Sequence, residues 1–458
     1  MNSTRLEMDS IGSRPIDSHV YYGVQTQRAL ENFSQLGKPL SAFPRLLTAM
    51  AQIKIACAQA NARTAELAPH LARAISQACE EIIQGQWHDQ FPVSLLQGGA
   101  GTSTNMNVNE VVANRGLELL GHNKGEYQYL HPNDHVNCSQ STNDVYPTAL
   151  RLALYYQSQT LTSALSELVQ SFNNKSQAFC HINKVGRTQM QDAVPMTLGQ
   201  EFAAFGQSLA QCKHRIQAAS AHLLNVNLGG TAIGTGINAS ADFRAHALNN
   251  LSQITGLSLK HSHDLLQASW DTGDLVDISS TLKRLAINLS KIANDLRLLS
   301  SGPHCGFNEI HLPKMQPGSS IMPGKVNPVI PETINQIAFD VIGKDHAVCM
   351  AAEQAQLQLN AFEPLMAECL FTAMDRLTIG CQLLREKCIE QIEANTDQCE
   401  KNLRHSHALA TLFNPLLGYK ITSELINESN QLNVPFVELV QQRKLLSRVQ
   451  MQGLLKST

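Results

Sequence analysis

Apolar residues recur at alternating spacings of four and three between about residues 140 and 395. This spacing lines them along one side of a long helix, where they face neighbouring helices. Four runs lie at residues 161–172, 282–296, 334–342 and 377–388. The clearest run contains Leu198, Phe202, Phe205, Leu209, Cys212, Ile216, Ala219 and Leu223. Together the five runs predict an elongated bundle of long helices.

Few segments alternate with a period of two, so any strands are expected to be short. Polar, glycine-rich connections lie between the predicted helices, at residues 98–110, 131–147, 186–195, 227–238 and 318–328. Ser, Thr and Asn are favoured at helix N-termini for backbone reasons alone, so capping explains any one connection. Several such connections at the ends of bundle helices favour a functional role, because binding residues concentrate in loops.

The bulk composition limits the class of protein. The chain has 458 residues, which is too long for one hydrophobic core and predicts two to four domains or a long shared scaffold. Lys and Arg number 35 against 38 Asp and Glu, and this balance excludes a concentrated basic face for nucleic acid. The eleven cysteines include no C-x-x-C pair, which is typical of a reducing compartment. Without a signal pattern or a long apolar run, a cytoplasmic protein without a membrane partner is expected.

The polar connections combine neutral hydrogen-bond donors with a single cation. The segments "GTSTN" (101–105) and "QSTND" (140–144), and the pair Thr188 and Gln189, offer hydroxyls and amides near predicted helix ends. The segment "GSSIMPGKVNP" (318–328) adds two serines, Lys325 and Asn327. This mixture suits a small dicarboxylate. A polyphosphate would need G-x-x-x-x-G-K-[ST], which the sequence lacks.

Other kinds of site fit less well. The run "GGTAIGTG" follows a helix rather than a strand, so a dinucleotide site is not expected. His131 and His135 lie four apart, but Pro132 breaks the helix that would place them on one face. No metal site is therefore expected there. No Ser, His and acid triad can be assigned from spacing.

The segment 318–328 is similar to the signature of the aspartase/fumarase superfamily, whose members reversibly eliminate ammonia, water or amines to release fumarate. Residues 21–33, 101–111, 131–137, 140–149 and 228–236 resemble further family blocks, in the family's order. The details are similar to the aspartase branch, because fumarases typically have Ser at the position of Thr142 and His at that of Gln189. Gly324 and His304 depart from the usual aspartase pattern.

The resemblance implies a mainly α, three-domain aspartase/fumarase fold. Its expected domains are an N-terminal helical domain (1–139), a central long five-helix bundle (140–394) and a small C-terminal helical domain (395–458). Members of the family are homotetramers with a 20-helix core, and each active site draws loops from three subunits. No cofactor is expected to be required, and activation by Mg²⁺ is an expectation from the family alone.

The implied reaction is the anti-elimination of ammonia from L-aspartate. Removing the Cβ proton gives an enediolate dianion, so the site must stabilise added charge. One general base supplies about 10²–10⁴-fold, or roughly 3–5 kcal/mol. Each positioned donor to the developing oxyanion supplies about 3–4 kcal/mol, so several donors outweigh the base. This balance accounts for the many hydroxyls and amides.

The resemblance assigns roles position by position. Ser319 is the expected base on a mobile lid, where Lys325 stabilises its alkoxide, and Glu332 influences catalysis indirectly. Three groups are expected to hold the substrate: Ser141, Thr142 and Ser320 on the β-carboxylate; Thr188, Lys325 and Asn327 on the α-carboxylate; Thr102 and Asn143 near the amino group. Gln189 is counted with the binding residues. His131, Asn133 and Asp134 match a secondary carboxylate site of fumarases.

Two alternatives stay open at this point. One is fumarate hydratase, which would act on L-malate, and Thr142 and Gln189 argue against it. The other is a non-catalytic scaffold descended from the family. That alternative is disfavoured because every candidate catalytic position is filled.

Overall fold

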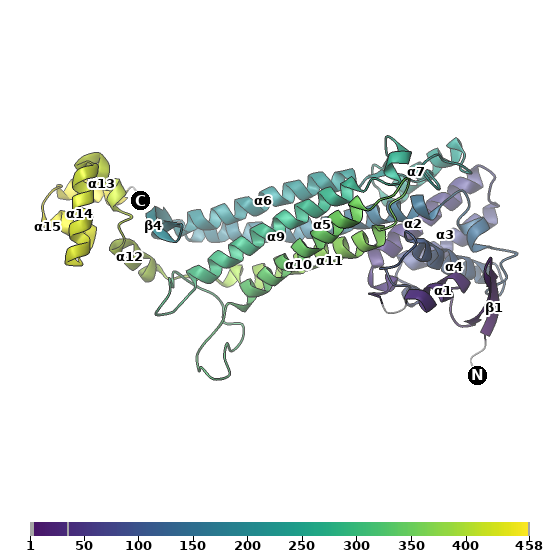
Figure 1. The fold of residues 1–458 in the computed structure, drawn as a ribbon, viewed down its shortest axis with the longest axis horizontal. Coiled ribbons are helices and arrows are strands. Elements are labelled where there is room, and N and C mark those ends of the chain that lie inside the picture. The colour runs from purple at the N-terminus through teal and green to yellow at the C-terminus, as the bar shows by residue number, and fades with distance from the viewer. Residues whose placement is uncertain (1–3, 34–35, 457–458) are drawn as a thin grey trace. The chain divides into compact units, whose positions relative to one another are not determined.

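The computed structural model describes residues 4–33 and 36–456 and is mainly helical, as the sequence predicts (Figure 1). The α-helices are α1 (Val24–Phe33), α2 (Pro44–Arg63), α3 (Pro69–Ile83), α4 (Thr102–Leu119), α5 (Thr142–Ala178), α6 (Leu198–His222), α7 (Ala241–Thr255), α8 (Leu265–Ala268), α9 (Gly273–Leu299), α10 (Val329–Glu353), α11 (Glu363–Lys387), α12 (Thr396–His405), α13 (Ala410–Leu417), α14 (Tyr419–Leu432), α15 (Phe436–Gln442) and α16 (Arg448–Lys456). The short helices are η1 (Leu40–Ala42), η2 (His88–Gln90), η3 (Pro132–Val136) and η4 (Ile389–Gln391).

The strands pair only in twos among the described residues, and the longest has seven residues. They are β1 (Thr4–Asp9), β2 (Gly12–Asp17), β3 (Asn183–Thr188), β4 (Gln191–Thr197), β5 (Asn225–Val226), β6 (Lys260–His261), β7 (Ile310–His311) and β8 (Glu393–Ala394). The β5–β6 pair is parallel and the other pairs are antiparallel. The segment 186–195, interpreted from sequence as a connection, is instead part of the β3–β4 hairpin.

The five predicted long helices are α5, α6, α9, α10 and α11 (Figure 1). The apolar positions that predicted them are nearly all buried, including Leu198, Phe202 and Leu209 in α6. The prediction that Ile342 in α10 is buried is wrong, because this residue is 37% exposed. The buried positions of α10 are instead 331, 334, 335, 338, 341, 345, 348 and 351, and Ile342 lies at the edge of that stripe.

The described residues pack into two compact units. Unit 1 comprises the described residues of Met1–Thr162, Arg215–Lys283 and Asp340–Arg376, and unit 2 comprises those of Ser163–His214, Arg284–Phe339 and Leu377–Thr458. Each of the five long helices contributes one part to each unit. The three predicted domains differ from these units because their boundaries fall between helices, and they stay a prediction. Their outer ends, residues 1–3 and 457–458, lie outside the described residues.

Unit 2 contains a five-helix bundle. Contacts link α5 to α6, α6 to α9, α9 to α10, α10 to α11 and α11 back to α5, so the five segments enclose a shared core. The contacts are Phe172 with Phe202, Asn288 with Cys212, Asn335 with Ser290, a close approach of Ile337 to Gly380, and Arg385 with Glu167. The bundle of five long helices that the spacing predicts is confirmed within this unit.

Unit 1 is organised around α2, which packs against α3 and α7. Most of its side chains are buried, because apolar residues occupy all of its faces rather than one stripe. Two of these buried residues, Lys54 and Asn61, are polar. The β1–β2 hairpin and α1 pack together, and α1 also packs against α4. None of the described helices combines the length and apolarity needed to cross a membrane.

Candidate functional site

The segment 318–328 of unit 2 is a loop whose two ends are tied together. The Gly318 N–H donates to the carbonyl oxygen of Lys325 over 2.8 Å. The Asn327 Nδ2 donates to the carbonyl oxygen of Gly318 over 3.0 Å. Only glycine fits at 318, because a Cβ there would lie 2.6 Å from the Lys325 carbonyl oxygen. The loop tip is exposed, with Ile321 at 83%.

Ser319 lies at the start of this loop. Its Oγ accepts the backbone N–H groups of Ile321, at 3.2 Å, and of Met322, at 3.0 Å. Both donors face the oxygen, so they would stabilise negative charge on it. Ser320 follows and is exposed. The hydroxyl predicted to act as a base therefore already has two fixed hydrogen-bond donors.

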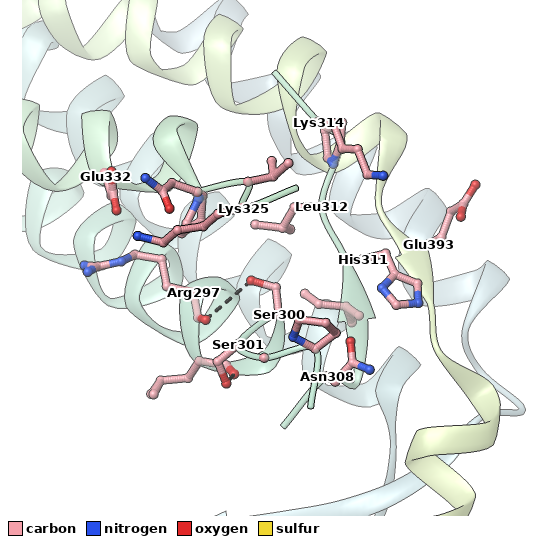
Figure 2. A pocket seen from close by; sticks show the side chains of 18 of the residues that line it. Arg297, Ser300, Ser301, Asn308, His311, Leu312, Lys314, Lys325, Glu332 and Glu393 are labelled. Atoms are coloured by element: carbon pink, nitrogen blue, oxygen red, sulfur yellow. Dashed lines mark hydrogen bonds between the residues drawn. The ribbon is translucent and has the colours of Figure 1, made fainter. Parts of the chain in front are cut away.

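Lys325, Asn327 and Glu332 line one open pocket of about 1690 Å³ in unit 2. Figure 2 shows Arg297, Lys325 and Glu332 on one side of this pocket, with His311 and Glu393 on the other. Glu332 comes from the first turn of α10, directly after the loop. The pocket therefore combines cationic side chains with two carboxylates and neutral donors.

Thr188 and Gln189 lie at the tip of the β3–β4 hairpin, also in unit 2. Gln189 and Met190 form its two-residue turn, and both have positive φ, +54° and +64°. Non-glycine residues adopt this conformation at a cost, and such strain is commonest at functional sites. Thr188 and Gln189 are exposed. Both side chains are therefore available to bind a ligand.

A buried carboxylate anchors this hairpin. Glu309 accepts from Arg187 Nη2 over 2.8 Å and lies 3.0 Å from Lys184 Nζ, and both cations come from β3. Asn402 of α12 donates to the same carboxylate over 3.0 Å. Burial acts to raise the pKa of Glu309, but the Arg187 hydrogen bond and the Lys184 charge together lower it. Its neighbour Asn308 lines the pocket, so Glu309 links the hairpin to the pocket wall.

The second group of predicted residues lies in unit 1, at the start of α5. Ser141 caps this helix: its Oγ accepts the Asn143 N–H over 3.2 Å. In return, Asp144 Oδ1 accepts the Ser141 N–H over 3.0 Å. Ser141 is therefore a helix cap, as capping alone would explain. Because its oxygen is the acceptor in that bond, the hydroxyl proton can still be donated. The Asn143 side chain donates to the carbonyl oxygen of Ala232 over 2.8 Å.

Asp144 joins this helix start to the glycine-rich loop at 227–238. Its Oδ2 accepts the N–H groups of Gly229, at 2.9 Å, and Thr231, at 3.0 Å. Burial raises the pKa of the Asp144 carboxyl to about 6, although the backbone donors and the Lys54 charge oppose that shift. The "GGTAIGTG" run therefore has a structural role, since its backbone N–H groups bind the Asp144 carboxylate at the start of α5.

Thr102 is brought to the same region by a close backbone contact. Gly101 has φ +86°, and a Cβ on it would lie 2.5 Å from the ring of Tyr146 in α5. Thr102 begins α4, and Asn105 on that helix donates to Thr142 Oγ1 over 3.1 Å. The start of α4 and the start of α5 therefore form one cluster of hydroxyls and amides within unit 1.

A second pocket, of about 520 Å³, lies in unit 1 and is lined by Thr102, Ser103, His131 and Asn133. His131 Nδ1 accepts the N–H groups of Asn133 and Asp134, at 3.1 and 3.2 Å. Pro132 begins the short helix η3 rather than continuing a longer one. Of the three residues for which the resemblance predicts a secondary carboxylate site, His131 and Asn133 border the same pocket as Thr102, and Asp134 does not.

This chain is similar to known lyases over most of its length. A family model described as "Lyase" matches residues 13–343. Aspartate ammonia-lyase from Pseudomonas aeruginosa is 50% identical over 454 residues, covering 99% of this chain and 96% of that protein. Aspartate ammonia-lyase from Escherichia coli is 50% identical over 419 residues, covering 91% and 88%.

The chain belongs to this lyase family.

Solved structures from the lyase family agree with the fold. A fumarate lyase:delta crystallin from Brucella melitensis, bound to cobalt, has a TM-score of 0.97 at 49% identity, and covers 99% of this chain and 98% of that chain. A class II fumarase from Schistosoma mansoni has a TM-score of 0.93 at 33% identity, with 99% and 98% covered. The predicted aspartase/fumarase fold is therefore confirmed.

The predicted residues fall into two groups by unit, and in unit 2 only Lys325, Asn327 and Glu332 line the pocket, whereas Ser319, Ser320, Thr188 and Gln189 do not. Thr102, Ser141, Thr142 and Asn143 form the group in unit 1. Thr188, Gln189, Ser319, Ser320, Lys325, Asn327 and Glu332 lie in unit 2. Sequence reasoning assigned no role to Asp144, Glu309 or Lys54. The sequence offered one signal for Asp144, its place three residues after Ser141 at a helix start, which is a capping pattern.

Proposed function

We propose that this chain is an aspartate ammonia-lyase, a carbon–nitrogen lyase that reversibly eliminates ammonia from L-aspartate to give fumarate. The observation that carries this function is the 50% identity to aspartate ammonia-lyases over nearly the whole chain. The chemistry of the two residue groups supports it, because hydroxyls, amides and one lysine suit a four-carbon dicarboxylate. We further propose that the protein works in the cytoplasm.

The unit 1 group would hold the β-carboxylate, where charge develops. Ser141 Oγ already accepts the Asn143 N–H, and Thr142 Oγ1 already accepts Asn105 Nδ2. A hydroxyl whose oxygen is occupied in this way can orient its proton outward as a donor. Two such donors are worth about 3–4 kcal/mol each toward a developing oxyanion. Ser320 would add a third when the lid closes.

Ser319 would remove the Cβ proton as an alkoxide. The two N–H groups on its Oγ would each stabilise that charge by about 1.5–3 kcal/mol. A Lys325 ammonium about 4 Å away would add roughly 4 kcal/mol at an effective dielectric constant of about 20. These effects together lower the pKa of the hydroxyl by several units. Exclusion of water on lid closure would strengthen each of them.

The unit 2 residues Thr188, Lys325 and Asn327 would hold the α-carboxylate, with Gln189 beside them. Thr102 and Asn143 would lie near the amino group that leaves. Glu332 would act through the lid that it follows. The elimination is then an anti process: the proton leaves Cβ toward Ser319, electrons pass through the enediolate, and ammonia leaves the neighbouring carbon.

The active form is proposed to be a homotetramer in which three subunits build each site. Large apolar side chains are exposed on α9, α10 and α11, where a further subunit could cover them: Ile287, Leu298, Phe339, Ile342, Met350 and Ile379. Mixing the inactive variants Ser319→Ala and Thr142→Ala would test this. Restored activity in the mixed tetramer requires that the two residues reach one site from different subunits. Mixtures that stay inactive would contradict it.

The activity itself is tested by incubating the protein with L-aspartate and following the absorbance of fumarate. We expect fumarate from L-aspartate without an added cofactor, and a chelator series would reveal any activation by Mg²⁺. L-malate in the same assay distinguishes a fumarate hydratase. A signal with L-malate and none with millimolar L-aspartate would overturn the proposed function.

A further inference from the structure

Lys54 lies in the middle of α2 and is fully buried, with none of its surface exposed. Its Nζ donates to Asn137 Oδ1 over 3.1 Å and to Gln140 Oε1 over 2.9 Å. Both acceptors belong to the segment that leads into Ser141. A buried ammonium is costly unless nearby groups compensate it, so its position in the fold needs an explanation.

Three hydrogen bonds connect Lys54 to the predicted β-carboxylate site, and each is 3.1 Å long. Lys54 Nζ donates to Asn137 Oδ1, Asn105 Nδ2 donates to the same oxygen, and Asn105 Nδ2 also donates to Thr142 Oγ1. Asn109 Nδ2 donates to that oxygen as well. The amine therefore lies beneath the hydroxyls without contacting the ligand that they would bind.

The electrostatic role of the buried Lys54 ammonium depends on Asp144. The carboxylate is fully buried and accepts three backbone N–H groups, so the loops around the site depend on it. It also places a negative charge under a site proposed to bind an anion. Lys54 and Asp144 attract one another, and each favours the charged form of the other. The pair is neutral overall when both are ionised.

We propose that Lys54 is a positioning residue whose buried ammonium offsets the charge of Asp144, so that the Ser141–Thr142 site can accept a substrate carboxylate. This inference rests on the proposed function and deepens it. Without the ammonium, a dicarboxylate would approach an uncompensated buried anion. The hydrogen bonds of Lys54 hold the loop, and its charge sets the affinity.

The proposal makes binding depend on pH. The titratable groups that act on Lys54 are Cys57 of its own helix, Cys79 of α3 and Asp144 of α5. Burial raises the pKa of both thiols far above the neutral range, so they stay uncharged. Burial lowers the pKa of Lys54 to about 8, although Cys57 and Asp144 oppose the shift.

The sign follows from linkage. A bound dicarboxylate favours the ammonium and therefore raises the pKa of Lys54 above its value in the free protein. Affinity is then fully present below about pH 8 and is lost as the pH rises toward the higher pKa of the complex. A unit charge roughly 10 Å from a carboxylate changes binding on the order of tenfold at an effective dielectric constant of about 20.

The experiment measures succinate binding to the full-length protein by calorimetry from pH 7 to pH 9.5. Succinate is chosen because its carboxyl groups do not titrate in this range and it lacks an amino group. We expect about tenfold weaker binding at the alkaline end, with uptake of a fraction of a proton near pH 8.5 in buffers of different ionisation enthalpy. The variant Lys54→Met should bind weakly and lose this dependence.

Glu363 provides the control, because burial also raises its pKa to about 8. The variant Glu363→Gln should keep the alkaline loss and the proton uptake. If Lys54→Met does not fold, absent proton uptake in the wild type would still overturn the inference. Absent proton uptake in the wild type, its loss in Glu363→Gln, or an unchanged alkaline loss in folded Lys54→Met would each overturn the inference. A protein that binds no succinate and makes no fumarate would overturn the proposed function as well.

Discussion

Replacing Gly318 with alanine perturbs the lid at the point where its two ends meet. The new Cβ would lie 2.6 Å from the Lys325 carbonyl oxygen and 2.9 Å from the Asn327 amide nitrogen, whereas ordinary contacts begin at 3.4 Å. Both neighbours are backbone atoms, so relief requires the chain around Lys325 and Asn327 to move. The substitution therefore displaces two of the three residues expected to hold the α-carboxylate, Lys325 and Asn327.

The magnitude follows from the bonds that would be lost. Gly318 makes two hydrogen bonds across the loop, at 2.8 and 3.0 Å. Each is worth about 0.5–1.5 kcal/mol, so losing both changes the population of the closed pairing by roughly 5- to 150-fold. Misplacing a binding group by about 1 Å costs on the order of 10²-fold in rate. We expect kcat/KM for L-aspartate to fall about 100-fold.

Gly324 supplies the matched control in the same loop. Its φ is +80°, but a Cβ there meets nothing within 4 Å. Alanine at 324 therefore adds backbone strain of about 1–2 kcal/mol without displacing a neighbour. Its kcat/KM should fall by less than about tenfold.

Steady-state kinetics of both variants test this reasoning, with circular dichroism and chromatography to confirm fold and assembly. Gly318→Ala within about threefold of the wild type would refute it. So would a Gly324→Ala variant that loses as much activity as Gly318→Ala.

Two further predictions concern buried carboxyl groups. Glu309→Gln removes the anion between Lys184 and Arg187, although Lys184 keeps Glu201 as a second partner. Urea unfolding should therefore show about 1–3 kcal/mol less stability, and KM should rise more than kcat falls. An unchanged unfolding midpoint would count against the anchoring role. Burial raises the pKa of the Glu363 carboxyl to about 8, so ionisation of this group opposes folding. Its contribution to the free energy of unfolding is fully present below pH 4.5, the pKa in the unfolded chain, and is lost as the pH rises through 8. Glu363→Gln should therefore gain about 4 kcal/mol over the wild type between pH 5 and pH 8, seen as a growing difference in melting temperature, and a constant difference would contradict this.

The helical part of the fold could be predicted from sequence because burial there repeats with a period. Leu198, Phe202 and Leu209 lie on one side of α6 and are all buried, as their spacing predicts. Ile342 shows the limit, because an apolar residue at the edge of a stripe satisfies nearly the same spacing as one inside it. The hairpin at 183–197 could not be predicted, because its strands are short and the residue that anchors β3, Glu309, lies far along the chain.

The site could be predicted where residues are concentrated in short motifs. The segments 140–144 and 318–328 each carry several polar groups, so they stand out in the sequence. Lys54 and Glu309 do not stand out, and the role of Asp144 within segment 140–144 is not visible there, because these roles come from burial and from partners far along the chain. A charged residue looks the same in sequence whether it is solvated or buried. Only the folded chain shows that Lys54 contacts Asn137 and Gln140.

The most direct measurement compares the wild type with Ser319→Ala in the conversion of L-aspartate to fumarate, with the assembly of both proteins checked by light scattering. A serine base on a lid predicts rapid conversion by the wild type and a rate about 10²–10⁴-fold lower for an equally assembled variant. Equal rates for the two proteins, or no fumarate from either, would contradict it.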